Sequence, residues 1–256
     1  MSSSTSPIGI LDSGIGGLAV LSKLKKALPN EHFVYLADNA NLPYGNKTHV
    51  EILQYIEKAI AFFKQQNCKV VVVACHTASI IINQYRLKIK DTSAIIIDMV
   101  KPTLEEIEKS NKGKIGVIGT KYTIDSGIYE QEIKKLNITQ CVAVADAPGL
   151  VSLTESLYHN EKNNVAKLQM VEEYLKRLKL TDNDSLVLAC THYIHLRPYI
   201  SSFYSNKVKI IDGSQTAAQK TIKALVENRI LNKGEKNYDK FISSKKLYSF
   251  EKFKLL

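Results

Sequence analysis

Residues 70–77 read Val-Val-Val-Val-Ala-Cys-His-Thr, and residues 186–192 read Leu-Val-Leu-Ala-Cys-Thr-His. Each stretch is an apolar run of strand length that ends in Ala-Cys and then changes at once to polar residues. Such a run is typical of a buried strand in a parallel sheet. Ligands of open α/β sheets collect beyond the carboxyl ends of the strands, where Cys75 and Cys190 would lie. The stretches are about one domain length apart, which predicts two similar halves that each present one thiol to a shared cleft.

Strands and helices alternate through the first hundred residues. Strands are expected at 8–11, 33–36 and 70–75, and each is followed by a helix. The βαβαβα order predicts a parallel, doubly wound sheet. The first two helices each carry apolar residues at helical spacing on one face, which we expect to be buried: Leu18, Leu21, Leu24 and Leu28, then Ile52, Ile56, Ile60 and Phe63.

A second series of strands and helices begins near residue 114. Its expected strands and helices lie at 114–118, about 122–136, 141–144, 150–158, 162–179 and 186–190. A strand at 94–98 leaves the first unit. The strand at 208–211 and the helix after residue 215 are expected to return to the first sheet, and the last 25 or so residues to add a small strand and helix.

These patterns predict two pseudosymmetric, doubly wound α/β domains with mainly parallel sheets and the active site between them. The first domain would comprise residues 1–97 plus 208–256, and the second residues 98–207. No linker rich in Gly, Pro or Ser separates the halves, so we expect a continuous packed interface.

The composition is that of a soluble globular protein, with 45% hydrophobic and 23% charged residues. Its apolar runs are far shorter than the ~20 residues of a membrane span, and the N-terminus lacks the pattern of a secretion signal. We therefore expect a cytoplasmic protein with free thiols and no membrane partner. The net charge of +10 comes from scattered lysines without interleaved aromatic residues, which does not favour nucleic acid as a main partner.

Two cofactor chemistries compete for the predicted cleft. Cys75, His76, Cys190 and His192 are ligand types that zinc accepts, although the close CxxC spacing of structural zinc sites is absent. Residues 14–19 match G-x-G-x-x-A after a strand, a dinucleotide-binding pattern, and Asp38 ends the next strand near the expected acidic position. Against this, the charge of Asp12 would repel a pyrophosphate, and a nicotinamide site leaves the paired cysteines unexplained.

The third chemistry is proton transfer by two thiols on opposite faces of one carbon. Inversion of a stereocentre requires one group to remove a proton and another to return one from the other side, and a thiolate and a thiol suffice. Free cysteine has a pKa of about 8.5, so each thiol needs help to ionise near neutrality. Asp12 and His192 are the polar partners at the strand ends. The other two cysteines, Cys68 and Cys141, lack such surroundings and are expected to be packing residues.

Four motifs together resemble glutamate racemase, in order and at matching intervals over about residues 7–230. They are Asp-Ser-Gly-Ile-Gly-Gly at 12–17, Pro-Tyr-Gly at 43–45, Ala-Cys-His-Thr-Ala-Ser at 74–79 and Cys-Thr-His-Tyr at 190–193. The resemblance implies two α/β domains, no cofactor, no metal and interconversion of L- and D-glutamate to supply the D form for peptidoglycan. It also implies a homodimer.

The resemblance assigns roles to individual residues. Cys75 would act on D-glutamate with the help of Asp12, and Cys190 on L-glutamate with the help of His192, which Glu155 would orient. The residues on substrate-contact positions are Asp12, Ser13, Tyr44, Gly45, His76, Thr77, Thr120, Thr191 and His192.

His76 stands where the family usually has asparagine, a neutral amide. Neutral histidine can also donate and accept hydrogen bonds, so glutamate binding could survive the change. With a reference pKa of about 6.5, His76 is expected to titrate between about pH 5.5 and 7.5 and to place a cation beside Cys75. The alternatives are a racemase for aspartate or another amino acid, a nucleotide-binding oxidoreductase, and a non-catalytic homologue.

Overall fold

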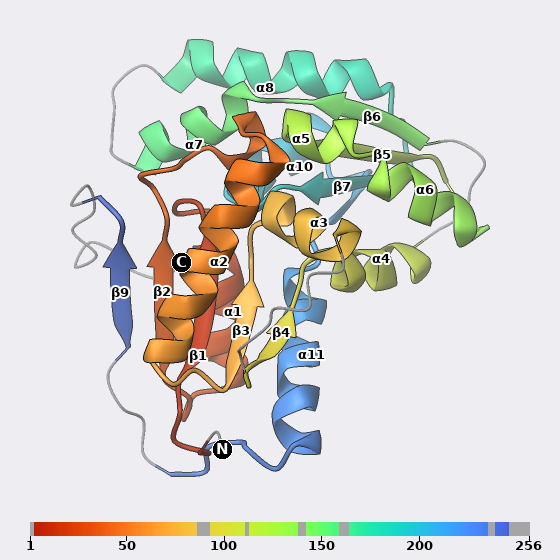
Figure 1. The fold of residues 1–256 in the computed structure, drawn as a ribbon. Helices are drawn as coiled ribbons and strands as arrows, with labels where there is room; N and C mark the ends of the chain where they lie inside the picture. Colours follow the sequence, from red (N-terminus) through yellow and green to blue (C-terminus); the bar gives the residue numbers. More distant parts are fainter. Residues whose placement is uncertain are drawn as a thin grey trace.

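In the computed structural model, the molecule has two halves, each built on its own parallel sheet, and the second sheet lies above the first in the view of Figure 1. The structure describes residues 3–85, 93–110, 113–137, 142–158, 164–234 and 239–245. The first sheet has the order β4-β3-β1-β2-β9, and every neighbouring pair is parallel. Its strands are β1 (Ile8–Asp12), β2 (Phe33–Ala37), β3 (Val70–Val73), β4 (Ile95–Ile97) and β9 (Lys240–Ser243).

The second sheet has the order β6-β5-β7-β8 and is also parallel throughout. Its strands are β5 (Ile115–Gly119), β6 (Val142–Asp146), β7 (Ser185–Ala189) and β8 (Lys209–Ile211). The neighbouring strands β1 and β3 at the centre of the first sheet therefore correspond to β5 and β7 at the centre of the second. The expected fold class, two α/β units with mainly parallel sheets, is confirmed.

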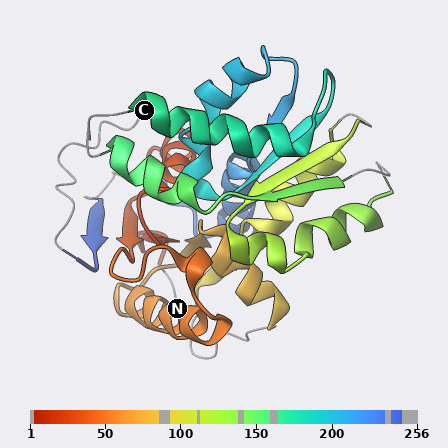
Figure 2. The ribbon, with the colours of Figure 1, turned by 90° about the horizontal axis from the view of Figure 1, so that it is seen from above.

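Helices cover both faces of each sheet. Figure 2, seen from above, shows α8 on one side of the second sheet and α6 on the other. The helices are α1 (Leu18–Ala27), α2 (His49–Gln65), α3 (His76–Gln84), α4 (Val100–Glu108), α5 (Lys121–Asp125), α6 (Ile128–Lys135), α7 (Gly149–Tyr158), α8 (Asn164–Leu178), α9 (Thr191–Ile194), α10 (Arg197–Phe203) and α11 (Ser214–Glu227), and Tyr44–Asn46 forms a 3-10 turn, η1.

The alternation of side chains along each strand divides the first half into two cores. Val70 and Val72 face the layer of α1 and α11, whereas Val71 and Val73 face α2 and α3. This explains why β3 is apolar at every position. The leucine face of α1 and the apolar face of α2 are buried as expected.

Two sequence expectations differ from the structure. The strand at 208–211 was expected in the first sheet, and that is wrong, because β8 pairs with β7 in the second. The helix after it does return, since α11 packs on α1. The single helix expected at 122–136 is two, because Gly127 has a φ of +64° between α5 and α6, a conformation that glycine adopts without strain. The expected C-terminal strand is β9, and the expected helix after it lies outside the described residues.

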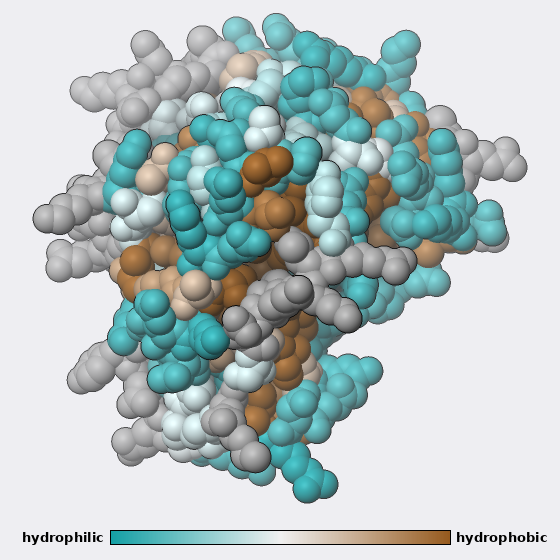
Figure 3. Space-filling model, in the orientation of Figure 1, coloured by the Kyte–Doolittle hydropathy of each residue, from teal (hydrophilic) through white to brown (hydrophobic). Residues whose placement is uncertain are grey.

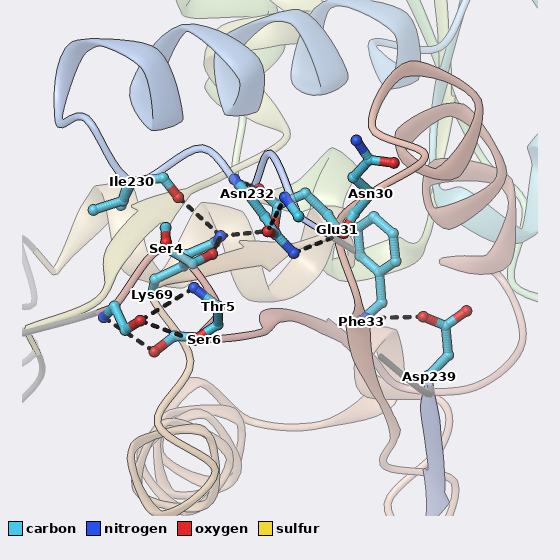
Figure 4. Close-up of polar contacts among 12 residues, drawn as sticks. Ser4, Thr5, Ser6, Asn30, Glu31, Phe33, Lys69, Ile230, Asn232 and Asp239 are labelled. Atoms are coloured by element: carbon cyan, nitrogen blue, oxygen red, sulfur yellow. Dashed lines mark hydrogen bonds and ion pairs between the residues drawn. The ribbon is translucent and has the colours of Figure 1, made fainter. Parts of the chain in front are cut away.

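A buried ion pair lies at the amino ends of β2 and β3 in the first sheet (Figure 4). Lys69 Nζ lies 2.6 Å from Glu31 Oε2, and both side chains are almost fully buried. The ammonium also donates to the carbonyl oxygens of Ser4 and Ile230, and Glu31 accepts from the backbone amide of Asn232. A buried pair of this kind is tolerated only when further hydrogen bonds satisfy both charges, as they do here.

The surface in Figure 3 is mostly hydrophilic, with apolar residues gathered along the middle of this face between α2 and α11. The edge strand β4 lies there, and its three isoleucines are half-buried. Among the described residues, no helix combines the length and apolar character that crossing a bilayer requires.

Candidate active site

The carboxyl ends of four strands, two from each sheet, meet at one small cavity. Asp12 ends β1 and Ser13 follows it, Cys75 lies just after β3, Thr120 follows β5, and Cys190 follows β7. This is the edge at which parallel sheets collect their ligands. The cavity is lined by Ser13, Pro43, Tyr44, Gly45, Cys75, His76, Thr77, Thr120, Val151, Cys190, Thr191 and His192. The structure therefore brings together all the site residues named from the sequence, with Asp12 and Glu155 directly behind this lining.

Asp12 joins the two halves at the cavity. Its Oδ1 accepts a hydrogen bond from the backbone amide of Gly14 at 2.9 Å, and its Oδ2 accepts one from Thr191 Oγ1 at 2.8 Å. Asp12 is completely buried. Burial raises the pKa of Asp12, and the positive charge of His192 partly offsets that rise. A carboxyl group with a raised pKa can exchange a proton with a neighbouring thiol more readily than an ordinary aspartate can.

Cys75 lies at the start of α3 and is 6% exposed. Burial raises the pKa of its thiol above the ordinary range, and the charge of Asp12 raises it further. The backbone amides of Ala78 and Thr77 act in the opposite direction. Asp12 therefore does not favour the thiolate by its charge. The groups that favour the thiolate are the backbone amides at the N-terminus of α3.

His192 is buried between an acid and the second thiol. Its Nε2 lies 2.7 Å from Glu155 Oε1, and the ring also hydrogen-bonds Cys190. Burial alone would lower the pKa of His192, but the contacts with Cys190 and Glu155, together with the charge of Asp12, raise it to about 10. The imidazole therefore carries a proton at neutral pH and can exchange it with Cys190.

The glycines of the loop after β1 allow the second half to approach closely. A Cβ atom on Gly14 would lie 2.1 Å from Glu155 Oε1, and one on Gly16 would lie 2.5 Å from Thr191 Oγ1. The backbone amide of Ile15 donates to Glu155 Oε1 at 3.1 Å. The space that a pyrophosphate would need beside this loop is filled by side chains of the second half. The structure thus explains the glycine pattern by close packing and gives no support to a dinucleotide site.

Tyr44 and Gly45 belong to η1, which closes the cavity from the side of the first half. The hydroxyl of Tyr44 donates to Asp38 Oδ2 at 2.7 Å, so Asp38 orients this tyrosine. A Cβ on Gly45 would lie 2.4 Å from Thr120 Cβ, which explains why a glycine is needed at this position. Thr120 Oγ1 and Thr77 Oγ1 are 3.0 Å apart and form a second polar contact between the halves.

His76 is buried and stays neutral, which corrects the expected titration near pH 6.5. Burial lowers the pKa of His76 to about 4, although Asp212 acts in the opposite direction. The expected cation beside Cys75 between pH 5.5 and 7.5 is therefore absent. Its Nδ1 lies 2.7 Å from the hydroxyl of Tyr129, a residue of α6 that the sequence did not single out.

The closed cavity measures about 10 Å³, close to the space that one water molecule occupies. This space is too small for an amino acid. Hydrogen bonds that cross between the halves at the site include those of Asp12 with Thr191, Ile15 with Glu155, and Thr77 with Thr120. Such bonds can be exchanged for hydrogen bonds to water or to a polar ligand.

Sequence reasoning missed three residues at the site. Pro43 and Val151 line the cavity, and Thr123 lies 3.0 Å from Thr120 through their hydroxyl oxygens. Pro43 lies in one of the quoted motifs, but nothing in the sequence marks the other two. Within the described part of the chain, no group of three or more His, Cys, Asp and Glu side chains is arranged to hold a metal ion, so the zinc alternative has no geometric support.

Comparisons with known proteins agree with this geometry. A profile of the family described as Asp/Glu/Hydantoin racemase matches residues 8–221. Glutamate racemase from Streptococcus thermophilus is 39% identical over 213 residues, which cover 82% of this chain and 76% of the relative. Glutamate racemase 1 from Caldanaerobacter subterraneus is 34% identical over 227 residues, 88% of this chain and 82% of the relative.

Solved structures show the same similarity. The crystal structure of a glutamate racemase isoform from Bacillus anthracis has a TM-score of 0.85 at 33% identity and covers 96% of this chain and 91% of that chain. The structure of glutamate racemase from Francisella tularensis in complex with D-glutamate has a TM-score of 0.82 at 29% identity, covering 94% and 89%. The resemblance expected from the four motifs is confirmed.

Proposed function

This chain belongs to the Asp/Glu/Hydantoin racemase family and is an amino-acid racemase, and we propose that its substrate is glutamate. Two relatives that cover 88% and 82% of the chain, at 34% and 39% identity, are glutamate racemases. The observation that carries the proposal is the pair Cys75 and Cys190, which follow matching strands of the two sheets and line one cavity.

The proposed reaction transfers protons between Cα and the two thiols. With L-glutamate, the Cys190 thiolate removes the Cα proton and the Cys75 thiol returns a proton to the opposite face. The product is D-glutamate, and the enzyme is left with a thiol at 190 and a thiolate at 75. The reverse reaction, or exchange with solvent, restores the starting state. No bond other than those to hydrogen is made or broken, so the step needs no oxidant or reductant.

The environments of the two sulfurs support these starting states. The raised pKa of Cys75 keeps its thiol protonated until a proton is required. His192 carries a proton and contacts Cys190, so the cation stands beside the sulfur that begins the reaction as a thiolate. Asp12 stands at the first thiol and His192 at the second. Glu155 orients His192 through the bond from Nε2 to Oε1.

Polar groups around the cavity suit a dicarboxylate. Hydroxyl-bearing residues line it, namely Ser13, Tyr44, Thr77, Thr120 and Thr191, together with Gly45 and the first residues of α3. Anions bind well to amides at the start of a helix. We propose that these groups, with His76, contact the two carboxylates and the ammonium group.

The wider expectations follow from the same proposal. We expect D-glutamate to be used for peptidoglycan, the enzyme to work in the cytoplasm without a cofactor, and the protein to form a homodimer. Residues 1–97 with 208–256, apart from strand β8, and residues 98–207 would be the units that separate to admit substrate.

The test is an assay of the purified protein on the separate enantiomers of glutamate and aspartate, with circular dichroism of the amino acid as the readout. Glutamate should lose its optical activity from either enantiomer, and aspartate should be converted much more slowly. Faster conversion of aspartate would show that aspartate, and not glutamate, is the substrate. No conversion of any amino acid would favour a non-catalytic homologue. Cys68→Ala is the matched control, because Cys68 is a buried free thiol away from the cavity.

A further inference from the structure

The contact between His76 and Tyr129 crosses from one half of the molecule to the other behind the cavity. His76 belongs to α3, and Tyr129 belongs to α6 in the second half. Both side chains are buried, with exposures of 1% and 2%. His76 Nδ1 and the Tyr129 hydroxyl are 2.7 Å apart. The rings do not stack, since their planes are inclined by 43°, so the hydrogen bond defines the contact.

The other ring nitrogen of His76 is left without a partner. Nε2 is buried and has no hydrogen-bond partner among the residues that the structure describes. His76 is also one of the residues that line the cavity, together with both cysteines. A buried nitrogen without a partner is costly, because its hydrogen bond to water has been lost without replacement. A polar group on a ligand in the cavity would supply the missing partner.

The direction of the Tyr129 hydrogen bond decides which partner Nε2 needs. A phenol is a stronger acid than a neutral imidazole N–H, and an imidazole nitrogen is a stronger base than a phenol oxygen. Burial raises the pKa of Tyr129, so its hydroxyl keeps its proton, and burial keeps His76 neutral. The hydroxyl therefore donates to Nδ1. The ring proton must then reside on Nε2, because each neutral imidazole carries one.

We infer that Tyr129 is a positioning residue that holds His76 in the Nε2–H tautomer, so that this N–H donates to a carboxylate oxygen of the substrate. The inference rests on the proposed function for the identity of the substrate, but the tautomer is a property of the protein alone. A single neutral donor binds a carboxylate without adding a charge beside Cys75, which a protonated histidine would do. Tyr129 itself touches neither the substrate nor a reacting atom.

The direct test is the ¹⁵N NMR spectrum of the full-length protein labelled in its histidines, recorded near pH 7. His76→Asn identifies the His76 resonances by their loss. We expect Nδ1 to be unprotonated and Nε2 to carry the proton, and Tyr129→Phe to shift the ring toward a mixture of tautomers. Adding glutamate to the native protein should shift the Nε2 resonance. A proton on Nδ1 in the native protein would overturn the inference. The spectrum of the native protein therefore tests the tautomer of His76 even if the Tyr129→Phe variant does not fold.

The kinetic test is a double-mutant cycle of Tyr129→Phe and His76→Asn. Tyr129→Phe should raise the KM for glutamate by roughly three- to ten-fold, the range for the loss of one hydrogen bond, with a much smaller change in kcat. In the His76→Asn background it should have almost no effect, because its partner is gone. Equal effects in both backgrounds would show that Tyr129 acts only on packing and would contradict the inference.

Tyr204→Phe is the matched control. Tyr204 is a partly buried tyrosine of the same half, and its hydroxyl donates to the carbonyl of Leu175 at 3.2 Å, away from the cavity. It should leave KM and the His76 spectrum unchanged. If the native protein converts no glutamate, the proposed substrate fails while the NMR spectrum still tests the tautomer, so the two failures are distinguishable.

Discussion

The hydroxyl of Thr191 donates a hydrogen bond to Asp12 Oδ2 across 2.8 Å, and this bond joins the residue after Cys190 to the end of strand β1. The charge of Asp12 also raises the pKa of the Cys75 thiol. One buried carboxyl group therefore influences the ionisation of Cys75 and also accepts a hydrogen bond from the residue next to Cys190. The bond that holds the two halves together at the site therefore also fixes the position of Asp12.

Both thiols should be required in both directions of the reaction. Cys75→Ser and Cys190→Ser should each lose racemisation of L- and D-glutamate, because a hydroxyl is a far weaker acid than a thiol and each direction needs an acid and a base. Initial rates from both enantiomers provide the measurement, with Cys68→Ala as the control. Near-native turnover by either serine variant would exclude the two-thiol assignment.

His192 should make the protein's stability depend on alkaline pH. Its folded-state pKa of about 10 lies above the value of about 6.5 in an unfolded chain. A raised histidine pKa contributes stability that is fully present below about pH 6.5 and is lost as the pH rises through about 10. Urea midpoints from pH 6 to 10.5 should therefore fall less steeply for His192→Asn than for the native protein. His49→Asn, at an exposed histidine, is the control, and parallel curves for all three proteins would refute the raised pKa.

Gly16 should tolerate no side chain, because a Cβ there would meet Thr191 and the backbone nitrogen of His192, 2.7 Å away. Gly16→Ala should separate the groups on the two sides of the cavity and lower kcat/KM by about a hundredfold, as small misplacements of catalytic groups can. Gly234→Ala is the control, since its Cβ would meet only an ordinary contact at 3.4 Å. If the two variants had equal kcat/KM, close packing at Gly16 would not matter for activity.

Leu24 should contribute strongly to the stability of the first half. It is completely buried in the core between α1 and the first sheet. Leu24→Ala should lower the free energy of unfolding by about 2–5 kcal/mol, as large-to-small changes in packed cores do. Denaturant unfolding measures this, and Lys26→Ala, on the exposed face of the same helix, should have little effect. A negligible change for Leu24→Ala would contradict the packing of α1.

The sequence could predict the strands and the position of the cysteines because both depend on local pattern. Apolar runs that stop at Cys75 and Cys190 mark where buried strands end. It could not predict the partner of β8, since an apolar run fits either sheet equally well and only packing decides. The loop after β1 was ambiguous for a similar reason. Glycines permit a close approach, but the sequence does not say whether a pyrophosphate or the side chain of Glu155 makes it.

His76 shows a different limit. Its identity and position were evident in the sequence, but its protonation state depends on burial and on Tyr129, which is 53 residues away in the chain. Residue type alone gives the reference pKa and not the shift that the surroundings impose. The same holds for His192, whose pKa moves in the opposite direction because Glu155 and Cys190 lie beside it.

The most direct test of the two-thiol mechanism is the fate of the Cα hydrogen during the first turnovers in D₂O. The protein is freed of metal with a chelator, and L-glutamate is the only other component besides buffer. Two opposed thiols should give D-glutamate with deuterium at Cα, while the remaining L-glutamate keeps its protium, because the proton removed by Cys190 is not the one that Cys75 returns. D-glutamate that retains protium, or a reaction that requires added metal or nicotinamide, would contradict the mechanism.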